Sequence, residues 1–392
     1  MSNHLRPSGA TCSCCTMSRR CFLGTSAAAA AVPLTAAAAT EDGKLTEYVE
    51  LADFRPKPHV RIMSAIIRFK PPYWLGWPGT AYDLEGHRQE YARIFQESAK
   101  RVGVSLEEAA QPLETEEAVK AYAAKVKGEQ PEALLISLQH LSAWNWVDIV
   151  AKEAGVPLVV FAPIGMAFTG HVIEISRRPG VHVVSSLETK AVEQAFRMVR
   201  AKRQFEESRV LVVHGDKRNE TVLERLGTKI RTVPRPMLHE LFERMPETDE
   251  VREVAKDMMK GAKDIVEPTK QDVLNAARSY VTAKRIVKDE DSNAITTDCL
   301  GMVSSKVVPT PPCMAATLFQ DAGVTYGCEA DLFAAISLMF VSYLFDKPGF
   351  QNDPVPETVH NNLIVAHCTC GTRLNGFDQP REPYVLRSHS ES

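Results

Sequence analysis

Acidic residues, a histidine and cysteines stand at the ends of three short apolar runs late in the sequence. The groups are Asp298-Cys299, then Tyr326 to Asp331 with Glu329 inside it, then Ala366-His367-Cys368. Each run predicts a buried strand. Carboxylates and an imidazole gathered at strand ends, with no basic patch nearby, suit a divalent metal ion and a polar small molecule. The stretch therefore predicts an enzyme site.

We expect the catalytic carboxylates to be Asp331, Glu329 and Asp298, although each has a structural alternative. Asp331 precedes a predicted helix and could simply cap it. Glu329, in the same turn, could exchange protons or merely support its neighbours. Asp298 ends a predicted buried strand, where a charge needs a partner.

The metal ligands expected are Asp331, Glu329 and His367. A histidine at the end of an apolar strand can also be a hydrogen-bonded core residue, but the polar residues that follow, Thr369 and Arg373, favour a functional role for His367. Asp, Glu and His together suit Mn²⁺, whereas oxygen ligands alone would favour Mg²⁺ or Ca²⁺.

Substrate-binding candidates come mainly from an earlier part of the chain. Trp74 and Trp77 lie in a Gly/Pro-rich loop after a predicted strand, where their rings could stack on the apolar face of a sugar or only pin the loop. His87 follows this loop, and His140 follows a later strand at the expected rim of a cleft. Arg373 is the fifth candidate.

These residues are positioned by alternating strand and helix patterns, which predict an α/β protein with two doubly wound, Rossmann-like parallel-sheet lobes. The expected divisions are a first lobe over 41–178, a second over 179–366 with a mostly helical insertion at about 217–290, and a short final segment over 367–392. Ligands of such sheets gather at the carboxyl ends of the strands.

Composition narrows the function classes. The chain has 392 residues, enough for two or three domains, and a formal net charge of −3 with scattered Lys and Arg. Nucleic acid is therefore not an expected partner. No Gly-rich phosphate loop follows a predicted strand, which argues against a dinucleotide.

The first forty residues resemble a twin-arginine export signal. Arg19-Arg20 precedes Cys21-Phe22-Leu23, an Ala-rich run follows, and Ala37-Ala38-Ala39 has a small-residue cleavage pattern. The run is too weakly apolar for a stable membrane anchor. We therefore expect removal of residues 1–40 and a periplasmic or secreted protein; a disordered extension is the alternative.

Removal of that segment would leave five of the nine cysteines, all within the last hundred residues. A disulfide framework would be spread through the fold, so they are expected to be mostly small buried residues around the site. Cys368 and Cys370 have one residue between them, too few for a usual zinc pair, but either could bond to another thiol after export.

Four segments together resemble the L-fucose/L-arabinose isomerase-like superfamily. They are Pro312-Cys313, Gly327 to Asp331, Lys347 to Phe350, and Asn362 to Cys368. The resemblance covers roughly residues 290 to 391. It implies a manganese ion bound by two acids and a histidine, aldose–ketose interconversion and a symmetric homo-oligomer. By motif match, Asp331 falls on the second acid and His367 on the histidine.

The sequence departs from that superfamily in two places. The first acid is expected a few residues after Cys299, where this chain has no carboxylate between Leu300 and Val303. Residues 381–389 resemble the opening of the superfamily's β-rich C-terminal domain, which we expect to be truncated or absent because the chain stops at Ser392.

The function expected is a metal-dependent carbohydrate-active enzyme, best tested first as an aldose–ketose isomerase. Proton transfer between two sugar carbons needs a Lewis acid and a carboxylate that takes and returns the proton. The alternatives are an exported glycan-cleaving enzyme on the same fold and a periplasmic sugar-binding receptor. A receptor would need no carboxylate–histidine–metal cluster.

Overall fold

The computed structural model describes residues 45–72, 81–163 and 165–389. The predicted export signal and both tryptophans of the loop, Trp74 and Trp77, lie outside these residues. Among the helices in the described ranges, none combines the length and the apolar composition needed to span a bilayer.

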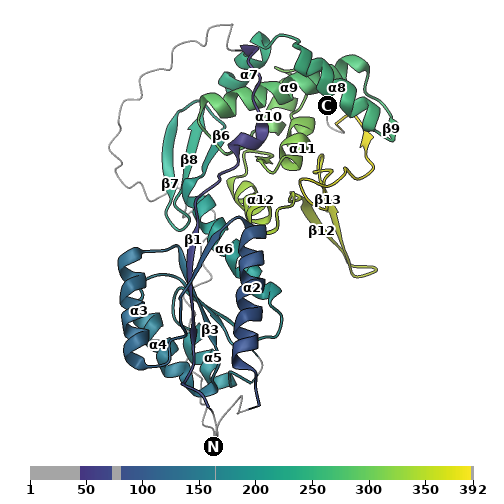
Figure 1. Ribbon diagram of the computed structural model, residues 1–392. Helices are drawn as coiled ribbons and strands as arrows, with labels where there is room; N and C mark the ends of the chain where they lie inside the picture. The colour runs from purple at the N-terminus through teal and green to yellow at the C-terminus, as the bar shows by residue number, and fades with distance from the viewer. Residues whose placement is uncertain (1–44, 73–80, 164, 390–392) are drawn as a thin grey trace, which may run out of the picture. The chain divides into compact units, whose positions relative to one another are not determined.

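The first sheet is parallel and doubly wound, as predicted (Figure 1). Its order is β2-β1-β3-β4-β5, and helices alternate with the strands along the chain. The strands are β1 (Arg61–Ile67), β2 (Ser105–Glu108), β3 (Ala133–Leu138), β4 (Leu158–Phe161) and β5 (Val181–Val184). The helices are α2 (Leu84–Val102), α3 (Glu116–Glu129), the 3-10 turn η2 (Leu141–Ala143), α4 (Trp144–Glu153), α5 (Thr169–Ser176) and α6 (Lys190–Glu207).

Successive side chains of β1 point to opposite faces of the sheet, and each face is covered by helices. Met63 and Ile67 enter a core that includes residues of α3 and α4. Ile62 enters a second core, formed with residues of α2 and α6. Since both faces are apolar, the strand reads as an almost continuous hydrophobic run.

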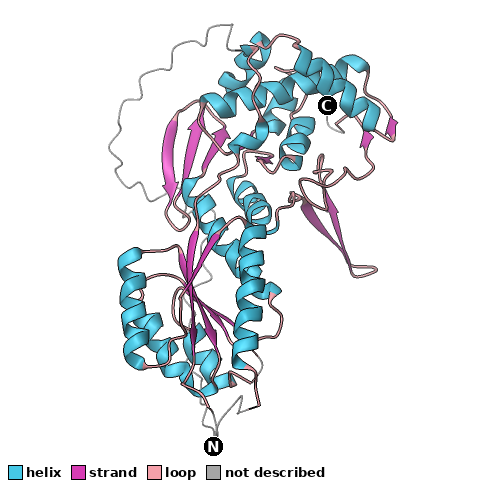
Figure 2. Ribbon diagram, in the orientation of Figure 1, coloured by secondary structure: helices cyan, strands magenta, loops and turns pink. Residues whose placement is uncertain are grey.

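The second sheet has the order β11-β10-β6-β8-β7, with β7 antiparallel to β8 and the other pairs parallel. Its strands are β6 (Arg209–Val213), β7 (Asn219–Leu223), β8 (Thr228–Val233), β10 (Ala294–Thr297) and β11 (Thr325–Gly327). The associated helices, shown in Figure 2, are α7 (Arg235–Arg244), α8 (Asp249–Gly261), α9 (Lys270–Asp289), α10 (Cys299–Ser305), α11 (Cys313–Asp321) and α12 (Leu332–Phe345). The α/β prediction is thus confirmed for both sheets.

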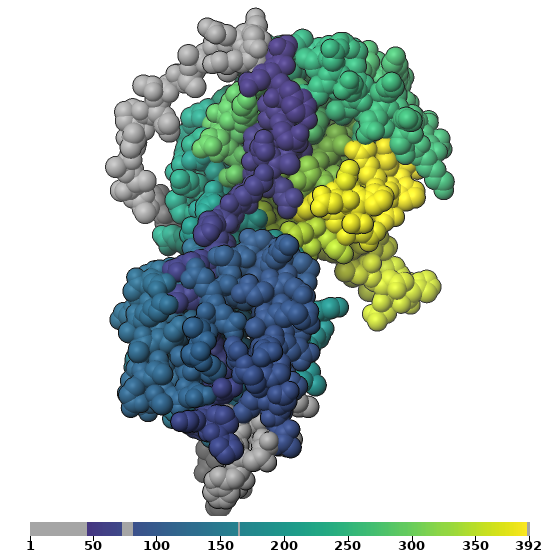
Figure 3. All heavy atoms as spheres, viewed as in Figure 1, coloured from purple at the N-terminus to yellow at the C-terminus, as the bar shows by residue number. Residues whose placement is uncertain are grey.

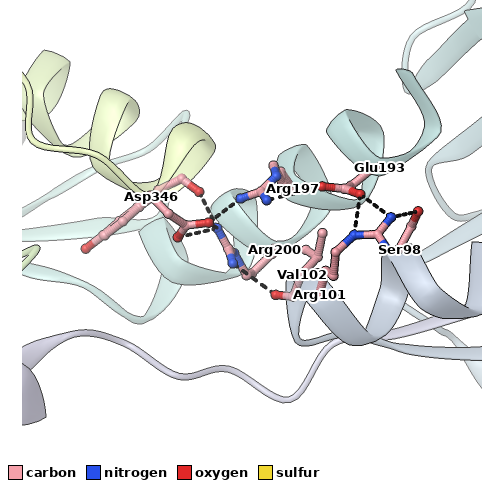
Figure 4. Close-up of polar contacts among 8 residues, drawn as sticks. Ser98, Arg101, Val102, Glu193, Arg197, Arg200 and Asp346 are labelled. Carbon is pink, nitrogen blue, oxygen red and sulfur yellow. Dashed lines mark hydrogen bonds and ion pairs between the residues drawn. The ribbon is translucent and has the colours of Figure 1, made fainter. Parts of the chain in front are cut away.

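Helix α6 contributes side chains to the cores of both sheets. Val192 and Phe196 belong to a core of the first sheet, and Ala201 and Phe205 belong to a core of the second. Further polar contacts link α6 to its neighbours: Arg200 donates to the carbonyl of Val102 and to Asp346, the residue after α12 (Figure 4).

The expected lobe divisions differ from the sheets in two places. The strand at Val181, expected to open the second lobe, pairs with β4 and completes the first sheet. At the other end, the 3-10 turn η1 (Leu51–Phe54) belongs to the second lobe, because Leu45 and Leu51 are buried in cores formed there. Figure 3 shows this N-terminal stretch in purple.

The insertion at 217–290, expected to be mostly helical, also contributes sheet. β7 and β8 form a hairpin at the sheet edge, in which Thr228, Ile230 and Val233 are buried. The interleaved Lys229 and Arg231 hid this alternation in the sequence. Another short strand, β9 (Asp264–Ile265), pairs with β14 (Val385–Leu386) from the C-terminal segment.

The prediction that Asn362 to Ala366 is a buried strand of the second lobe is wrong. These residues form β13, but it pairs antiparallel with β12 (Asp353–Glu357) in a two-stranded hairpin, and all five residues are exposed. The apolar run resembles a buried strand because periodicity cannot report its partner. That partner carries Pro354 and Pro356, which lack the N–H groups that extend a sheet.

Candidate metal centre

Parallel pairing of β10 with β11 brings the first two predicted groups together. Asp298-Cys299 follows β10, and Cys328-Glu329 follows β11. The turn after β11 is fixed by two bonds: Ala330 N donates to the carbonyl of Thr297 at 2.8 Å, and Glu329 N donates to Cys299 Sγ at 3.3 Å. Glu329 and Ala330 both have left-handed backbones, with φ of 66° and 52°, which non-glycine residues seldom adopt.

The hairpin supplies the other half of the site. Asp353 begins β12 and is paired with Ala366, the last residue of β13, so His367 follows directly beside it. Glu329, Asp353 and His367 can each offer a ligand atom, and these atoms lie within 4.8 Å of one another. His367 Nε2 is 3.8 Å from Glu329 Oε1, and only 3% of the histidine side chain is exposed. Two carboxylates and an imidazole at this spacing can hold one divalent ion.

Asp353 was not among the predicted ligands. Prolines interrupt the pattern of its strand, so no strand, and hence no strand end with a carboxylate, was predicted there. Between Leu300 and Val303 the chain has no carboxylate, and the second carboxylate of the cluster is Asp353 of the hairpin. The cue available was an acidic residue directly preceding Pro354.

Electrostatics at Glu329 favour the protonated form. Burial raises the pKa of Glu329, the charge of Asp353 raises it further, and His367 opposes the shift. A carboxyl group whose pKa is moved toward neutrality is better suited to exchange a proton than an ordinary surface glutamate.

Thiols surround the other side of His367. Its Nδ1 atom is 3.4 Å from Cys368 Sγ, and the thiol of Cys313 donates to Cys368 Sγ at 3.7 Å. Hydrogen bonds from Cys313 and Cys328 lower the pKa of Cys368. The five described cysteines are all free; Cys299 and Cys328 are buried as expected, whereas Cys368 and Cys370 are exposed.

A pocket of about 530 Å³ opens beside this cluster. Among its lining residues are Cys313, Phe350, His367, Cys368 and His389. The volume is within the range of small-molecule sites. The pocket therefore gives a solute access to both the histidine and the thiols.

Asp331 and Asp298 do not join the carboxylate cluster found among the described residues. Asp331 caps α12, with Oδ1 accepting from Ala334 N at 2.9 Å. Asp298 caps α10 in the same way and forms ion pairs with Arg235 and His214, at 2.5 and 3.6 Å. For Asp331 the helix cap was the structural alternative considered from the sequence, whereas the cap formed by Asp298 was not predicted.

The other predicted substrate residues are dispersed. His87, on α2, lies against Tyr82 with ring centroids 4.4 Å apart. His140 packs edge-on against Phe69, and its burial lowers the pKa of the imidazole. Its Nδ1 accepts a hydrogen bond from Ser142 N. Arg373 donates to the carbonyl of Phe377 and lines a separate polar pocket.

Comparison with known proteins shows no match to a protein-family model or to a curated protein. Among solved structures, a carbohydrate transporter from Acidothermus cellulolyticus bound to myo-inositol is 12% identical, with 74% of this chain and 90% of that chain covered and a TM-score of 0.23. GanP, a glucose-galactose binding protein from Geobacillus stearothermophilus, is 11% identical, with 79% of this chain and 98% of GanP covered and a TM-score of 0.23. TM-scores this low carry no information about activity or ligand.

Proposed function

We propose that this chain is a metal-dependent enzyme acting on a monosaccharide or small glycan, with aldose–ketose isomerisation as the reaction to test first. The observation that carries the proposal is the convergence of Glu329, Asp353 and His367, of which His367 also lines the 530 Å³ pocket. The resemblance of residues 290 to 391 to the L-fucose/L-arabinose isomerase-like superfamily suggests the same chemistry, with His367 as a ligand in both, but it assigns the acid to Asp331 and not to Asp353.

The donor set fits a divalent ion such as Mn²⁺, because two carboxylates and an imidazole are ligands that this ion accepts. When bound, the ion would polarise the oxygens of a sugar. The residues themselves would orient the ion and move a proton: Glu329, with its raised pKa, is the group we assign to proton exchange. Asp353 and His367 would then act mainly as ligands.

The test begins with the metal content of the full chain. Elemental analysis should find near-stoichiometric divalent metal, and Glu329→Gln, Asp353→Asn and His367→Ala should each reduce the retained Mn²⁺. Asp331→Asn is the matched control, since its carboxylate caps α12 outside the cluster. A panel of aldoses would then be assayed for ketose formation. Equal metal loss in the control and the three ligand variants would contradict the assigned ligand set.

A second candidate is an exported sugar-binding receptor, favoured by the topology of the first sheet. Its order β2-β1-β3-β4-β5 reverses direction between β1 and β3, and ligands of such sheets bind at that switch point. Arg68 follows β1, Gln139 follows β3, and their side chains are hydrogen-bonded at 3.3 Å. Sugar affinity measured by calorimetry separates the two candidates: a receptor would keep its affinity after chelation of metal and lose it in Gln139→Ala.

The export proposal rests on Arg19-Arg20 and the small residues that follow. N-terminal sequencing of the chain recovered from the periplasm of a producing cell should begin near residue 40. Substitution of both arginines by lysine should retain the protein in the cytoplasm. A homo-oligomer remains an expectation from the family resemblance and is checked by light scattering.

A further inference from the structure

We propose that Cys313, Cys368 and His389 form a second metal site, which takes a thiophilic d10 ion, Zn²⁺ or Cu⁺. The three residues come from α11, from the end of the hairpin and from the C-terminal segment after β14. Their ligand atoms lie within 4.8 Å of one another. No step of the proposed sugar chemistry uses them.

The sulfur separation fits a shared ion. Two thiolates each about 2.3 Å from a tetrahedral zinc ion lie about 3.8 Å apart. Cys313 Sγ and Cys368 Sγ are 3.7 Å apart. The sulfurs of a disulfide are about 2.05 Å apart, so the observed pair is not bonded.

The ligand chemistry separates this site from the carboxylate cluster. Thiolates prefer zinc and cuprous copper, whereas carboxylates prefer manganese and magnesium. Cys368 faces His367 Nδ1 at 3.4 Å, and the opposite ring nitrogen faces Glu329. The imidazole therefore divides a soft donor set from a hard one, and each set selects a different ion.

The site also has room for a fourth ligand. Cys313, Cys368 and His389 all line the 530 Å³ pocket, so a solute can reach an ion held between them. Three protein ligands with one accessible position are the arrangement of catalytic rather than purely structural zinc sites. Cys328 is a further nearby donor, because it shares a three-residue group with His367 and Cys368.

Cobalt(II) is the probe for the zinc arm, because cobalt–thiolate charge transfer reports sulfur ligation directly. The full chain, reduced and stripped of metal under anaerobic conditions, should bind one equivalent of Co²⁺ with this absorption band, and Zn²⁺ should displace it. For the copper arm, Cu⁺ is titrated against a colorimetric cuprous chelator. Tight retention of either ion supports the site, and the tighter of the two identifies the ion.

Variants assign the band to these residues. Cys313→Ser with Cys368→Ser should abolish it, and His389→Ala should weaken Co²⁺ binding by more than about 100-fold, since even outer-shell changes cost about 10- to 100-fold. Cys370→Ser is the matched control, because Cys370 is exposed and lies in neither thiol group. Glu329→Gln should also keep the band, which separates this site from the carboxylate cluster.

Three results would overturn the proposal: an undiminished band in the double serine variant, equal loss in the Cys370 control, or a Cys313–Cys368 disulfide in the chain purified without reductant. The His389 variant guards against a folding artefact, because it leaves both sulfurs in place. Its circular dichroism should match that of the unmodified chain.

Discussion

His367 Nε2 lies 3.8 Å from Glu329 Oε1, and the two residues reach this position from different supersecondary units. Glu329 follows β11 of the second sheet, while His367 follows β13 of the exposed hairpin. The hairpin must therefore hold its place against the sheet for the carboxylate cluster to exist. The contacts around this site, and those of the helices that support it, lead to five predictions.

As the pH is lowered, the carboxylate cluster should begin to lose metal at a higher pH than a site built with a glutamate of ordinary pKa. The pKa of Glu329 is raised, so the proton is held more tightly in the folded chain and competes with the ion until the pH exceeds the raised value. Mn²⁺ affinity should fall as the pH drops through that value. Isothermal titration across a pH series measures it, and Asp249→Asn, which removes an exposed carboxylate that does not act on Glu329, should leave the profile unchanged.

The same shift predicts the stability of the metal-free chain. A raised folded-state pKa means that protonated Glu329 stabilises the fold at low pH and that this contribution is lost as the pH rises through the raised pKa. Glu329→Gln, which stays neutral, should therefore be more stable than the unmodified chain at neutral pH without metal. Urea titrations at two pH values measure this difference; a gap that does not shrink at low pH would contradict the electrostatic explanation.

Ala330→Gly should be neutral or stabilising by up to about 1 kcal/mol. A left-handed backbone costs an L-residue about 1–2 kcal/mol, which exceeds the added unfolded-state entropy of glycine. Ala330 has a φ of 52°. Ala124→Gly on the exposed side of α3 is the control and should destabilise by about 1 kcal/mol. Thermal denaturation of both variants gives the comparison; equal destabilisation would show that the turn is not strained.

Asp346→Asn should destabilise the chain by about 1.5–3 kcal/mol, the range for hydrogen bonds to charged groups. Its carboxylate accepts from both Arg197 and Arg200 of α6, two arginines whose side chains are only 20% and 13% exposed (Figure 4). Asp249→Asn is the matched control. That aspartate is 91% exposed and pairs with Arg252, so its loss should cost less than about 1 kcal/mol. Urea unfolding measures both.

Asp298 should behave as a structural residue. Asp298→Ala removes the cap of α10 and should cost about 1–2 kcal/mol, whereas Asp298→Asn keeps a capping oxygen and should cost less. Neither variant should change the Mn²⁺ content. Metal analysis and thermal denaturation on the same preparations distinguish this role from a catalytic one, since a drop in metal at unchanged stability would return Asp298 to the site.

The sequence predicted the parts of the fold where burial on both faces produces long apolar runs. β1, β3 and β4 are such strands, because all of their residues except the first of β1 are buried. The strand that each run pairs with was harder to predict. The apolar sequence of Asn362 to Ala366 is compatible both with a strand inside a sheet and with an exposed hairpin. Strands whose charges alternate with β-branched residues, such as β8, were missed for the opposite reason.

For the candidate site, the sequence indicated which residues carry suitable side chains better than it indicated what each of them does. Glu329 and His367 do come together, because both follow strand ends. Asp331 and Asp298 have the same chemistry as metal ligands and as helix caps, so only their observed bonds to backbone N–H groups distinguish the two uses. Asp353 could not be placed without knowing that β12 pairs with β13.

Helix α6 fills one core with its first turns and another with its last. If either end frays, a sheet loses part of its apolar covering, so neither lobe can melt without weakening the other. The two lobes should consequently denature as one cooperative unit, and a fragment that ends within α6 should fail to fold.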